Sequence, residues 1–283
     1  MSEREDHLSS RDFSRLCNLV YDVAGIRLTA EKKTMLEMRI RRRLRALDCH
    51  SYALYCERLF RLDPSDDEMV HFIDVVTTNK TDFFREPGHF DFLRDTCLGE
   101  WSARLGLSRP MLLWSAACSS GEEPYTLAMV LSEHAAGAPG FNFGILATDV
   151  STTVLEKAVK GIYPAASVEP VPMGMRRKYL MRSRNRESGQ VRVVPELRRM
   201  VEFRRLNFMD GDYGLTRKAD VIFCRNVLIY FDRPTQERIL ARLTRYLHPL
   251  GYLFVGHSES LHDMQLPLVP VGPAVYRRVS SAS

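Results

Sequence analysis

The sequence has no apolar run that approaches the roughly 18 residues a membrane-spanning helix needs. Its start, residues 1–6, is too charged for the apolar core of a secretory signal. We therefore expect a cytoplasmic protein that does not insert into a membrane. With 45% hydrophobic and 27% charged residues over 283 positions, the chain also lacks the bias of disordered or fibrous proteins and is long enough for two cores.

Motifs of several common site types are missing. The six cysteines form no Cys-x-x-Cys pair and the eight histidines show no metal-ligand spacing, so neither a disulfide framework nor a metal site is expected. There is no GxxxxGK[ST] phosphate loop and no HExxH zinc motif. Residues 256–260, GHSES, differ from the GxSxG of hydrolases because the last residue is serine. These absences argue against a nucleotide hydrolase, a zinc peptidase and a serine hydrolase.

Positive charge is concentrated rather than abundant. The 40 Lys and Arg only slightly exceed the 35 Asp and Glu, and so small a surplus does not by itself indicate a nucleic-acid partner. Between positions 39 and 45, however, all but two residues are arginine: Arg39, Arg41, Arg42, Arg43 and Arg45. Such a run is usually a solvated face, and it can also bind an acidic partner.

Residues 8–77 carry only helical patterns, which predict a bundle of four helices. The helices are expected to begin near Ser9, Thr29, Tyr52 and Ser65. The segments Ser9-x-x-Asp12 and Ser65-x-x-Glu68 both resemble capping boxes, and Gly25 offers a stop for the first helix.

The second of these helices carries the arginine run. Leu36, Ile40 and Leu44 recur at helical spacing and are expected to face the bundle. This places Arg41, Arg42 and Arg45 on the far side of the helix, with Arg39 and Arg43 on its flanks. We therefore expect the arginines to face solvent or a partner.

After Pro87, short apolar runs alternate with helical stretches, which predicts βαβ units. Strands are expected at 111–116, 144–148, 201–203, 220–224 and 251–255, and helices at 122–135, 151–160 and 234–247. The fold class is therefore α/β, with a mostly parallel, doubly wound sheet. Residues 269–278 suggest an antiparallel pair at one edge, and polar residues 182–189 suggest an inserted β-hairpin.

Polar residues follow four successive expected strands, at the edge where doubly wound sheets bind ligands. Small residues and Glu122-Glu123 follow the first strand, Asp149 ends the second, Asn207-Phe208 follow the third and Arg225-Asn226 the fourth. Carboxylates at a helix start argue against a phosphate and favour hydroxyls or positive charge. The set predicts a nucleoside pocket without a phosphate site, which points to S-adenosylmethionine. Taken alone, Asp149-Val150-Ser151 could instead simply cap the next helix.

Five segments are distinctive in combination: residues 77–86, 114–125, 147–149, 223–231 and 256–259. Together they resemble the chemotaxis-receptor glutamate methyltransferase family (CheR), and the resemblance covers nearly the whole chain. Small departures at Cys118-Ser119, Lys80 and Asp82 remove no matched functional side chain. The resemblance implies an all-helical domain at 1–77, a linker at 78–87, and a Rossmann-like methyltransferase domain at 88–283 with an inserted antiparallel β-subdomain at 178–206.

The resemblance also implies the cofactor, S-adenosylmethionine, its product S-adenosylhomocysteine, and the residues of the site. The residues implied for cofactor binding are Asn79, Thr81, Arg85, Glu123, Asp149, Asn207, Phe208, Arg225 and Asn226. Arg85 and Tyr230 match the family's proposed catalytic pair. On the residues alone, Arg85 could instead form an ion pair with Glu86 or Asp82, and Tyr230 could be a core aromatic.

The reaction that the resemblance implies, methyl transfer to protein glutamate, needs no catalytic base. A glutamate side chain has a pKa of about 4.3 and is already ionised near pH 7. A His/Asp or Cys/His constellation is therefore not required. Alignment of the reacting groups can supply about 7–11 kcal/mol of the barrier reduction.

The implied partners are methyl-accepting chemotaxis receptors. The five arginines of 39–45 are candidates for docking an acidic, helical methylation region, and the inserted hairpin for adding a strand to a receptor tail peptide. We expect a monomer and no nucleic-acid partner. Two alternatives stay open: a nucleic-acid methyltransferase, although no NPPY-like motif follows the fourth strand, and a non-enzymatic S-adenosylmethionine-sensing module.

Overall fold

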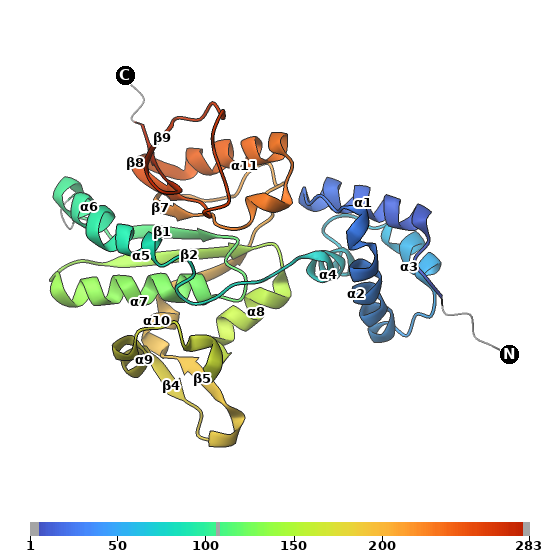
Figure 1. Ribbon diagram of the computed structural model, residues 1–283, viewed down its shortest axis with the longest axis horizontal. Helices are drawn as coiled ribbons and strands as arrows, with labels where there is room; N and C mark the ends of the chain where they lie inside the picture. The colour runs from blue at the N-terminus through green and yellow to red at the C-terminus, as the bar shows by residue number, and fades with distance from the viewer. Residues whose placement is uncertain (1–5, 106–107, 280–283) are drawn as a thin grey trace.

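Four helices form the N-terminal domain of the computed structural model, which describes residues 6–105 and 108–279 (Figure 1). They are α1 (Ser10–Ala24), α2 (Lys33–Ala46), α3 (Tyr52–Leu59) and α4 (Asp67–Val76), with a 3-10 turn, η1 (Ala30–Lys32), before α2. Ser9 accepts a hydrogen bond from the backbone N–H of Asp12, and Gly25 ends α1 in the left-handed conformation, with φ 71°. The expected four-helix bundle is confirmed.

The start of α4 differs from the expected capping box. Asp66, not Ser65, is the N-cap residue, and Glu68 turns into the bundle, where it is 7% exposed. Glu68 accepts hydrogen bonds from Arg43 Nε and from the Tyr55 hydroxyl, both at 2.9 Å. Burial opposes the ionised form of Glu68, but these hydrogen bonds outweigh it and lower its pKa.

The arginines of α2 divide between structural and exposed positions. Arg39 donates from Nη1 to three carbonyl oxygens at the end of α4, those of residues 75–77, at 2.8–3.0 Å. Arg43 forms the buried ion pair just described, whereas Arg42 and Arg45 are exposed. The expectation that all five arginines face outward is therefore wrong for Arg39 and Arg43, because their flank positions let them reach α4.

Seven strands form the main sheet, in the order β6-β2-β1-β7-β8-β10-β9. Their bounds are β1 (Met111–Ala116), β2 (Phe143–Asp149), β6 (Val201–Arg205), β7 (Ala219–Phe223), β8 (Leu247–Phe254), β9 (Leu268–Gly272) and β10 (Val275–Arg278). The first five strands in this order pair in parallel, and β10 is antiparallel to both β8 and β9. The predicted doubly wound sheet and its antiparallel edge are confirmed.

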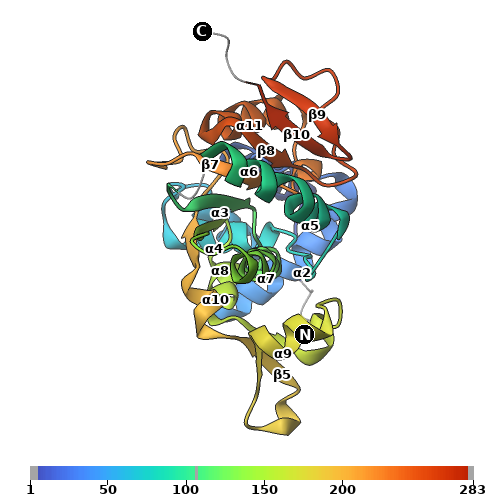
Figure 2. The same cartoon turned by 90° about the vertical axis from the view of Figure 1, so that its left-hand side faces the viewer.

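Helices cover both faces of the main sheet (Figure 2). One face packs on α5 (Gly88–Phe92), the π-helical turn η2 (Leu93–Cys97), α6 (Leu98–Leu105), α7 (Glu122–Gly137), α8 (Thr152–Lys160) and α10 (Pro195–Arg199), and the other on α11 (Arg233–Tyr246). Successive residues of β1, Leu113 and Trp114, belong to different cores because strand side chains alternate between faces. No helix among the described residues is long and apolar enough to cross a membrane.

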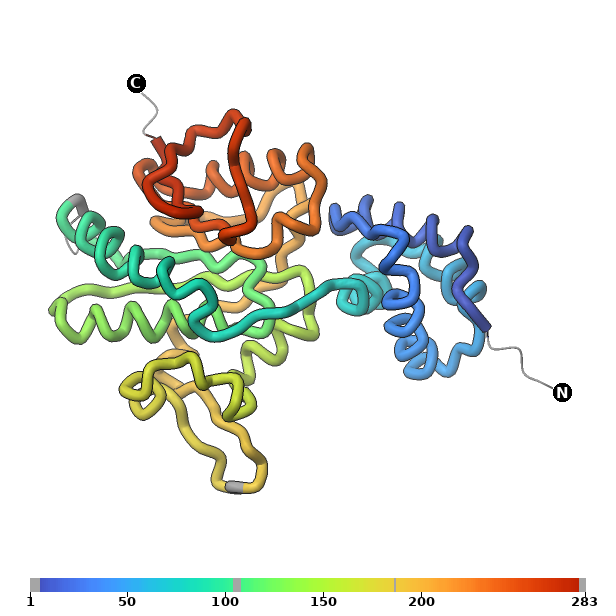
Figure 3. Tube along the Cα trace, in the orientation of Figure 1, coloured from blue at the N-terminus to red at the C-terminus, as the bar shows by residue number. Residues whose placement is uncertain are grey.

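A second, smaller sheet is inserted between α8 and β6 and extends away from the main sheet (Figure 3). Its antiparallel strands lie in the order β3-β5-β4, with bounds β3 (Ile162–Pro164), β4 (Leu180–Arg182) and β5 (Gln190–Val193). Between them lie η3 (Ala165–Val168), α9 (Met173–Tyr179) and η4 (Arg186–Ser188). The expected β-hairpin is present as β4 and β5.

The bounds expected for this insertion, 178–206, need correction at both ends. The small sheet begins earlier, because Ile162–Pro164 pairs with β5. Val201–Arg205 lies within those bounds but pairs with β2 of the main sheet. A three-residue strand that ends in proline carries too little alternation to be recognised from sequence.

The small sheet is anchored to the loop after β1 by Tyr163. The Tyr163 hydroxyl donates a hydrogen bond to the carbonyl oxygen of Ser120 at 2.7 Å. A Cβ atom on Gly121 would lie 2.8 Å from that hydroxyl and 2.9 Å from the Cβ of Ala158, and Gly121 has φ 98°. Only glycine fits this position, both for its backbone conformation and for the space available.

The helical domain is joined to the carboxyl-terminal edge of the main sheet by side chains. Asp74 of α4 accepts hydrogen bonds from the backbone N–H of Thr152 at 2.9 Å and from the hydroxyls of Thr152 and Thr153 at 2.7 and 2.9 Å. Asn207 Nδ2, after β6, donates to the carbonyl oxygen of Val23 at 2.6 Å. The two domains therefore meet where the parallel strands end.

We expect Glu68→Ala to destabilise the folded chain by about 1–3 kcal/mol, because Arg43 and Tyr55 lose a buried acceptor that they share. Urea unfolding followed by far-UV circular dichroism measures this loss. The exposed Glu57 of α3 provides the control, since Glu57→Ala should change the free energy of unfolding by less than about 0.5 kcal/mol. Equal losses in the two variants would contradict the role given to the buried pair.

The effect of Glu68 should also depend on pH. The pKa of Glu68 is lower in the folded chain than in the unfolded chain, where it is about 4.3. The ionised side chain therefore stabilises the fold fully above the unfolded-state pKa, and this stabilisation is lost as the pH falls through the folded-state pKa. Wild type and Glu68→Ala should therefore converge in stability in acid.

Candidate functional site

A cleft lies between the helical domain and the carboxyl ends of the parallel strands, and holds about 1200 Å³ with its open mouth included. That is ample for a nucleoside-sized ligand. All the residues expected to bind the cofactor or to catalyse line it: Asn79, Thr81, Arg85, Glu123, Asp149, Asn207, Phe208, Arg225, Asn226 and Tyr230. The fold thus brings together residues from the linker and from four strand ends.

Asp149, the last residue of β2, is a buried carboxylate on the wall of this cleft. It accepts hydrogen bonds from the backbone N–H groups of Ser119 at 2.8 Å and Ser151 at 3.0 Å. Burial raises the pKa of Asp149, and these hydrogen bonds only partly offset it. Of the segment 149–151, which could alternatively cap α8, the N-cap residue is Ser151, whose side chain accepts from the N–H of Val154, and Asp149 is not the capping residue.

Glu123, at the start of α7, is held in place by two neighbours. Its Oε1 accepts a hydrogen bond from Ser115 Oγ at 2.7 Å, and its Oε2 accepts one from Arg225 Nε at 2.8 Å. The Arg225 side chain is only 2% exposed, and its guanidinium lies 5.2 Å from the ring centre of Phe90. A buried guanidinium in contact with a carboxylate orients it firmly, so the direction of Glu123 is set before any ligand binds.

Arg225 also holds the linker, residues 78–87. Its Nη1 donates to the carbonyl oxygen of Arg85 at 2.8 Å and lies 3.3 Å from Glu86 Oε2. Asn226 Nδ2 donates to the other oxygen of Glu86 at 3.0 Å. Arg225 Nε and Nη1 and Asn226 Nδ2 are thus engaged with protein atoms, while both residues also line the cleft.

The linker backbone is strained on both sides of Arg85. Phe84 has φ 52° and Glu86 has φ 57°, in the left-handed region that residues other than glycine seldom adopt. Each such conformation costs on the order of 1–3 kcal/mol and persists only where the surroundings enforce it. Here the N–H of Phe84 donates to Thr126 Oγ1 at 3.2 Å, and Arg225 and Glu86 provide the contacts just described.

The Arg85 side chain itself is only lightly held. Its Nη1 donates to the carbonyl oxygen of Lys80 at 3.1 Å. Glu86 pairs with Arg225 and Asn226 instead, so the alternative of an Arg85–Glu86 ion pair is wrong. The guanidinium of Arg85 is therefore available at the cleft, on a backbone that is fixed.

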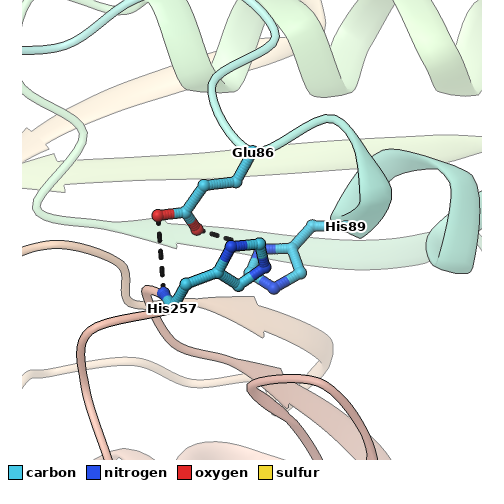
Figure 4. Close-up of side chains that lie close together, drawn as sticks. All are labelled: Glu86, His89 and His257. Carbon is cyan, nitrogen blue, oxygen red and sulfur yellow. Dashed lines mark hydrogen bonds and ion pairs between the residues drawn. The ribbon is translucent and has the colours of Figure 1, made fainter.

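A cluster of Glu86, His89 and His257 lies behind the linker, with ligand atoms within 4.8 Å of one another (Figure 4). His89 Nδ1 is 3.1 Å from Arg225 Nη1, and His89 Nε2 is 3.3 Å from the carbonyl oxygen of Pro273. Burial and the charge of Arg225 lower the pKa of His89 to about 4, so the ring is neutral near pH 7. Its Nδ1 then accepts from Arg225 and its Nε2 donates to Pro273.

This arrangement does not favour a metal ion. A positive guanidinium already contacts both His89 and Glu86, so a second cation there would meet strong repulsion. Burial raises the pKa of Glu86, but the hydrogen bond from Asn226 and the charge of Arg225 outweigh it, and the net pKa is lowered. The cluster supports the linker and completes the surroundings of Arg225.

Asn207 and Phe208, which follow β6, contribute differently from the carboxylates. The Asn207 amide is used in the contact with Val23 of the helical domain, and its Oδ1 accepts from the N–H of Met209 at 3.0 Å. Phe208 is 8% exposed and its ring centre lies 6.3 Å from that of Phe231. This part of the cleft wall is apolar.

The helical domain supplies lining residues that sequence analysis missed. Ile26, Arg27 and Lys32 line the cleft from the segment that connects α1 to α2, and Met35 lines it from the first turn of α2. No motif marks them, because they reach the cleft only through the docking of one domain on the other. Tyr230 faces them from η5 (Leu228–Tyr230), and within the described residues its hydroxyl makes no hydrogen bond.

These features define an enzyme class. The sheet is doubly wound with an antiparallel edge, and an acidic residue ends β2. Buried carboxylates occupy the helix start that a phosphate-binding loop would leave open to an anion. This arrangement is typical of a methyltransferase that binds a nucleoside cofactor. The carboxylates of Glu123 and Asp149 suit ribose hydroxyls and an ammonium group, and Val150, Leu206 and Phe208 suit an adenine ring. The cleft therefore fits S-adenosylmethionine.

Comparison with known proteins identifies the family. Residues 79–272 match the "CheR methyltransferase, SAM binding domain" and residues 11–77 the "CheR methyltransferase, all-alpha domain". The chain is 40% identical over 269 residues to the chemotaxis protein methyltransferase of Salmonella typhimurium, covering 95% of this chain and 90% of that protein. It is 39% identical over 273 residues to chemotaxis protein methyltransferase 2 of Pseudomonas aeruginosa, covering 96% and 95%.

The chain therefore belongs to the CheR methyltransferase family. Its cofactor is S-adenosylmethionine, and it is a methyltransferase of chemotaxis, as the sequence resemblance implied. The comparisons support neither the nucleic-acid methyltransferase nor the non-enzymatic sensing module.

We expect Arg225→Lys to lower the free energy of unfolding by roughly 3 kcal/mol and to weaken binding of S-adenosylmethionine at least tenfold. A lysine keeps the charge but cannot reach Glu123, the Arg85 carbonyl and Glu86 together. Thermal unfolding and isothermal titration calorimetry measure the two effects. The exposed Arg238 of α11 gives the control Arg238→Lys, which should leave both unchanged; wild-type affinity in Arg225→Lys would refute the bridging role.

Proposed function

We propose that this protein transfers a methyl group from S-adenosylmethionine to glutamate side chains in the cytoplasmic region of chemoreceptors, forming methyl esters. The observation that supports this most strongly is that Arg85 and Tyr230 line the same cleft as Glu123 and Asp149. Relatives that match 95–96% of the chain are chemotaxis protein methyltransferases, and the acceptor proposed here is the one that their role in chemotaxis suggests.

The cleft suits an acceptor that is already ionised. Bound S-adenosylmethionine supplies an electrophilic methyl group on a positively charged sulfur. A glutamate carboxylate has a pKa of about 4.3 and attacks without first losing a proton. No histidine or cysteine is found among the described residues that line the cleft, which agrees with a reaction that needs no general base.

The residues of the cleft then act by placement. The planar fork of Arg85 is suited to hold the acceptor carboxylate, and the hydroxyl of Tyr230 orients the reacting groups from the opposite wall. The strained linker holds the backbone of Arg85 in place before the substrate arrives. Such alignment supplies about 7–11 kcal/mol in favourable cases. Lys32 and Lys80, also on the cleft wall, add positive charge that attracts an acidic substrate.

Two exposed arginines are proposed to dock the receptor. Arg42 and Arg45 stand on the outer side of α2, where an acidic helix can approach. Arg41 lies beside them and is 3.4 Å from Glu37. Arg39 and Arg43 contribute to docking only by holding α2 against α4.

The small sheet is proposed to hold an extended receptor tail. β4 is an edge strand, and its central residue Met181 is 40% exposed. An extended peptide can add to such an edge through main-chain hydrogen bonds. A chain that holds its substrate through two separate surfaces of its own needs no second copy, and we propose that it acts as a monomer.

The chemistry can be tested with methyl-labelled S-adenosylmethionine and a chemoreceptor cytoplasmic fragment. We expect wild type to produce label that base releases as methanol, since carboxyl methyl esters are base-labile. Arg85→Ala should lower kcat at least a hundredfold, and Tyr230→Phe at least tenfold, because each loses a group that aligns the reactants. Arg238→Lys, at an exposed residue that does not line the cleft, is the matched control.

Base-stable label on the receptor would contradict glutamate esters. Full kcat in Arg85→Ala or Tyr230→Phe would contradict the role proposed for that residue. Binding of S-adenosylmethionine with no transfer to any receptor would contradict the proposed acceptor.

Binding affinities for different receptor fragments distinguish the two proposed docking surfaces. The double substitution Arg42→Glu and Arg45→Glu should weaken binding to a tail-less receptor fragment at least tenfold at low salt, and this difference should shrink above about 0.5 M salt because exposed charges are screened. Deleting residues 182–189 should instead weaken binding of an isolated tail peptide and leave the tail-less fragment unaffected. Unchanged affinity for every receptor tail would rule out the small sheet as the tail site.

A further inference from the structure

Glu259 is a buried carboxylate to which sequence analysis assigns no role. It lies in the turn after β8, is 7% exposed, and does not line the cleft. Its Oε1 accepts a hydrogen bond from the backbone N–H of Leu228 at 2.7 Å, and its Oε2 accepts from the backbone N–H groups of Asn226 at 2.9 Å and Gly256 at 2.6 Å. Three backbone donors from two separate loops thus converge on one side chain.

Two of these donors belong to the loop that carries Tyr230. This loop runs from Asn226 through η5, and Asn226 has φ 57°, a conformation that needs support from its surroundings. At the far end, the carbonyl oxygen of Tyr230 accepts from the backbone N–H of Arg27 at 2.9 Å. Glu259 therefore holds the loop at its start, and the helical domain holds it at its end.

The turn that contains Glu259 fits closely against the same loop. A Cβ atom on Gly256 would lie 2.4 Å from Asn226 Nδ2 and 2.9 Å from the backbone nitrogen of Asn226. Asn226 Nδ2 in turn donates to Glu86 of the linker. The GHSE segment, residues 256–259, thus supports the cleft from behind, with Gly256 allowing the approach and Glu259 providing the acceptors.

We propose that Glu259 is a positioning residue for the transfer reaction, which acts by fixing the backbone of residues 226–230 and thereby the place of the Tyr230 hydroxyl. This inference rests on the proposed function, in which Tyr230 orients the reacting groups. The carboxylate is specifically required. Glutamine has nearly the same size but only one oxygen, and its NH₂ group would face the N–H donors of the loop.

The test combines kinetics with amide hydrogen exchange in the full-length protein. In Glu259→Gln we expect faster exchange in peptides that cover residues 226–231, kcat lowered at least tenfold and the Kd of S-adenosylmethionine changed less than threefold. In a Tyr230→Phe background the same substitution should lower kcat less than threefold further, because the group that it positions is already absent. The exposed Glu237 of α11 supplies the control Glu237→Gln, with exchange and kcat as in wild type.

Each result has a distinct meaning. Unchanged exchange in residues 226–231 would overturn the role of Glu259. An equal fall of kcat in the wild-type and Tyr230→Phe backgrounds would also overturn it, since a merely structural carboxylate would act equally in both. Full kcat in Tyr230→Phe alone would instead overturn the proposed function of Tyr230, whatever Glu259 does to exchange.

A second variant covers the case in which Glu259→Gln does not fold. Glu259→Asp keeps both oxygens on a side chain one methylene shorter, so it should loosen residues 226–231 partially and lower kcat in proportion. Faster exchange at this loop with wild-type kcat would overturn the positioning role.

Discussion

The buried guanidinium of Arg225 is the contact on which the cleft depends. A positive charge that is 2% exposed is costly unless it is fully paired, and its partners here are Glu123, Glu86 and the carbonyl oxygen of Arg85. Those partners come from the start of α7 and from the linker. Pairing the charge of Arg225 therefore fixes the positions of both segments. The strained backbone around Arg85 persists because of this constraint. The cofactor wall and the proposed catalytic arginine are therefore parts of one electrostatic unit.

The cleft also exists only as a product of two domains. Asp74 of the helical domain accepts hydrogen bonds from the first turn of α8, and Asn207 donates to the carbonyl oxygen of Val23. Arg27 and Lys32 then complete a lining to which the linker and the ends of the strands also contribute residues. The helical bundle, which the buried ion pair of Glu68 stabilises, thus helps to form a site that lies outside the bundle. Substitutions in α2 or α4 can affect activity without touching the substrate.

Much of the fold and of the cleft could be predicted from the sequence, and the physical reasons for this also explain which features could not. Helical spacing and alternating apolar runs are local, so the bundle and the main sheet could be expected, and the rule that parallel strands end at one edge placed Glu123 and Asp149 together. Partners across the fold are not local. Nothing in the spacing of Arg43 and Glu68 indicates that they pair inside the bundle, or that Glu259 serves a loop some thirty residues earlier. The three-residue strand β3 was too short to show a period.

Gly121 illustrates why a motif can persist for reasons other than catalysis. It lies in the distinctive segment after β1, beside the cofactor cleft, and a side chain there is forbidden by Tyr163 of the small sheet, by Ala158 of α8 and by the backbone angle. A descendant of this chain that had lost methyl transfer would still need glycine at this position to keep the small sheet attached. Retention of this glycine therefore indicates an intact scaffold, whereas on the proposed mechanism it is loss of Arg85 or Tyr230 that would mark an inactive homologue.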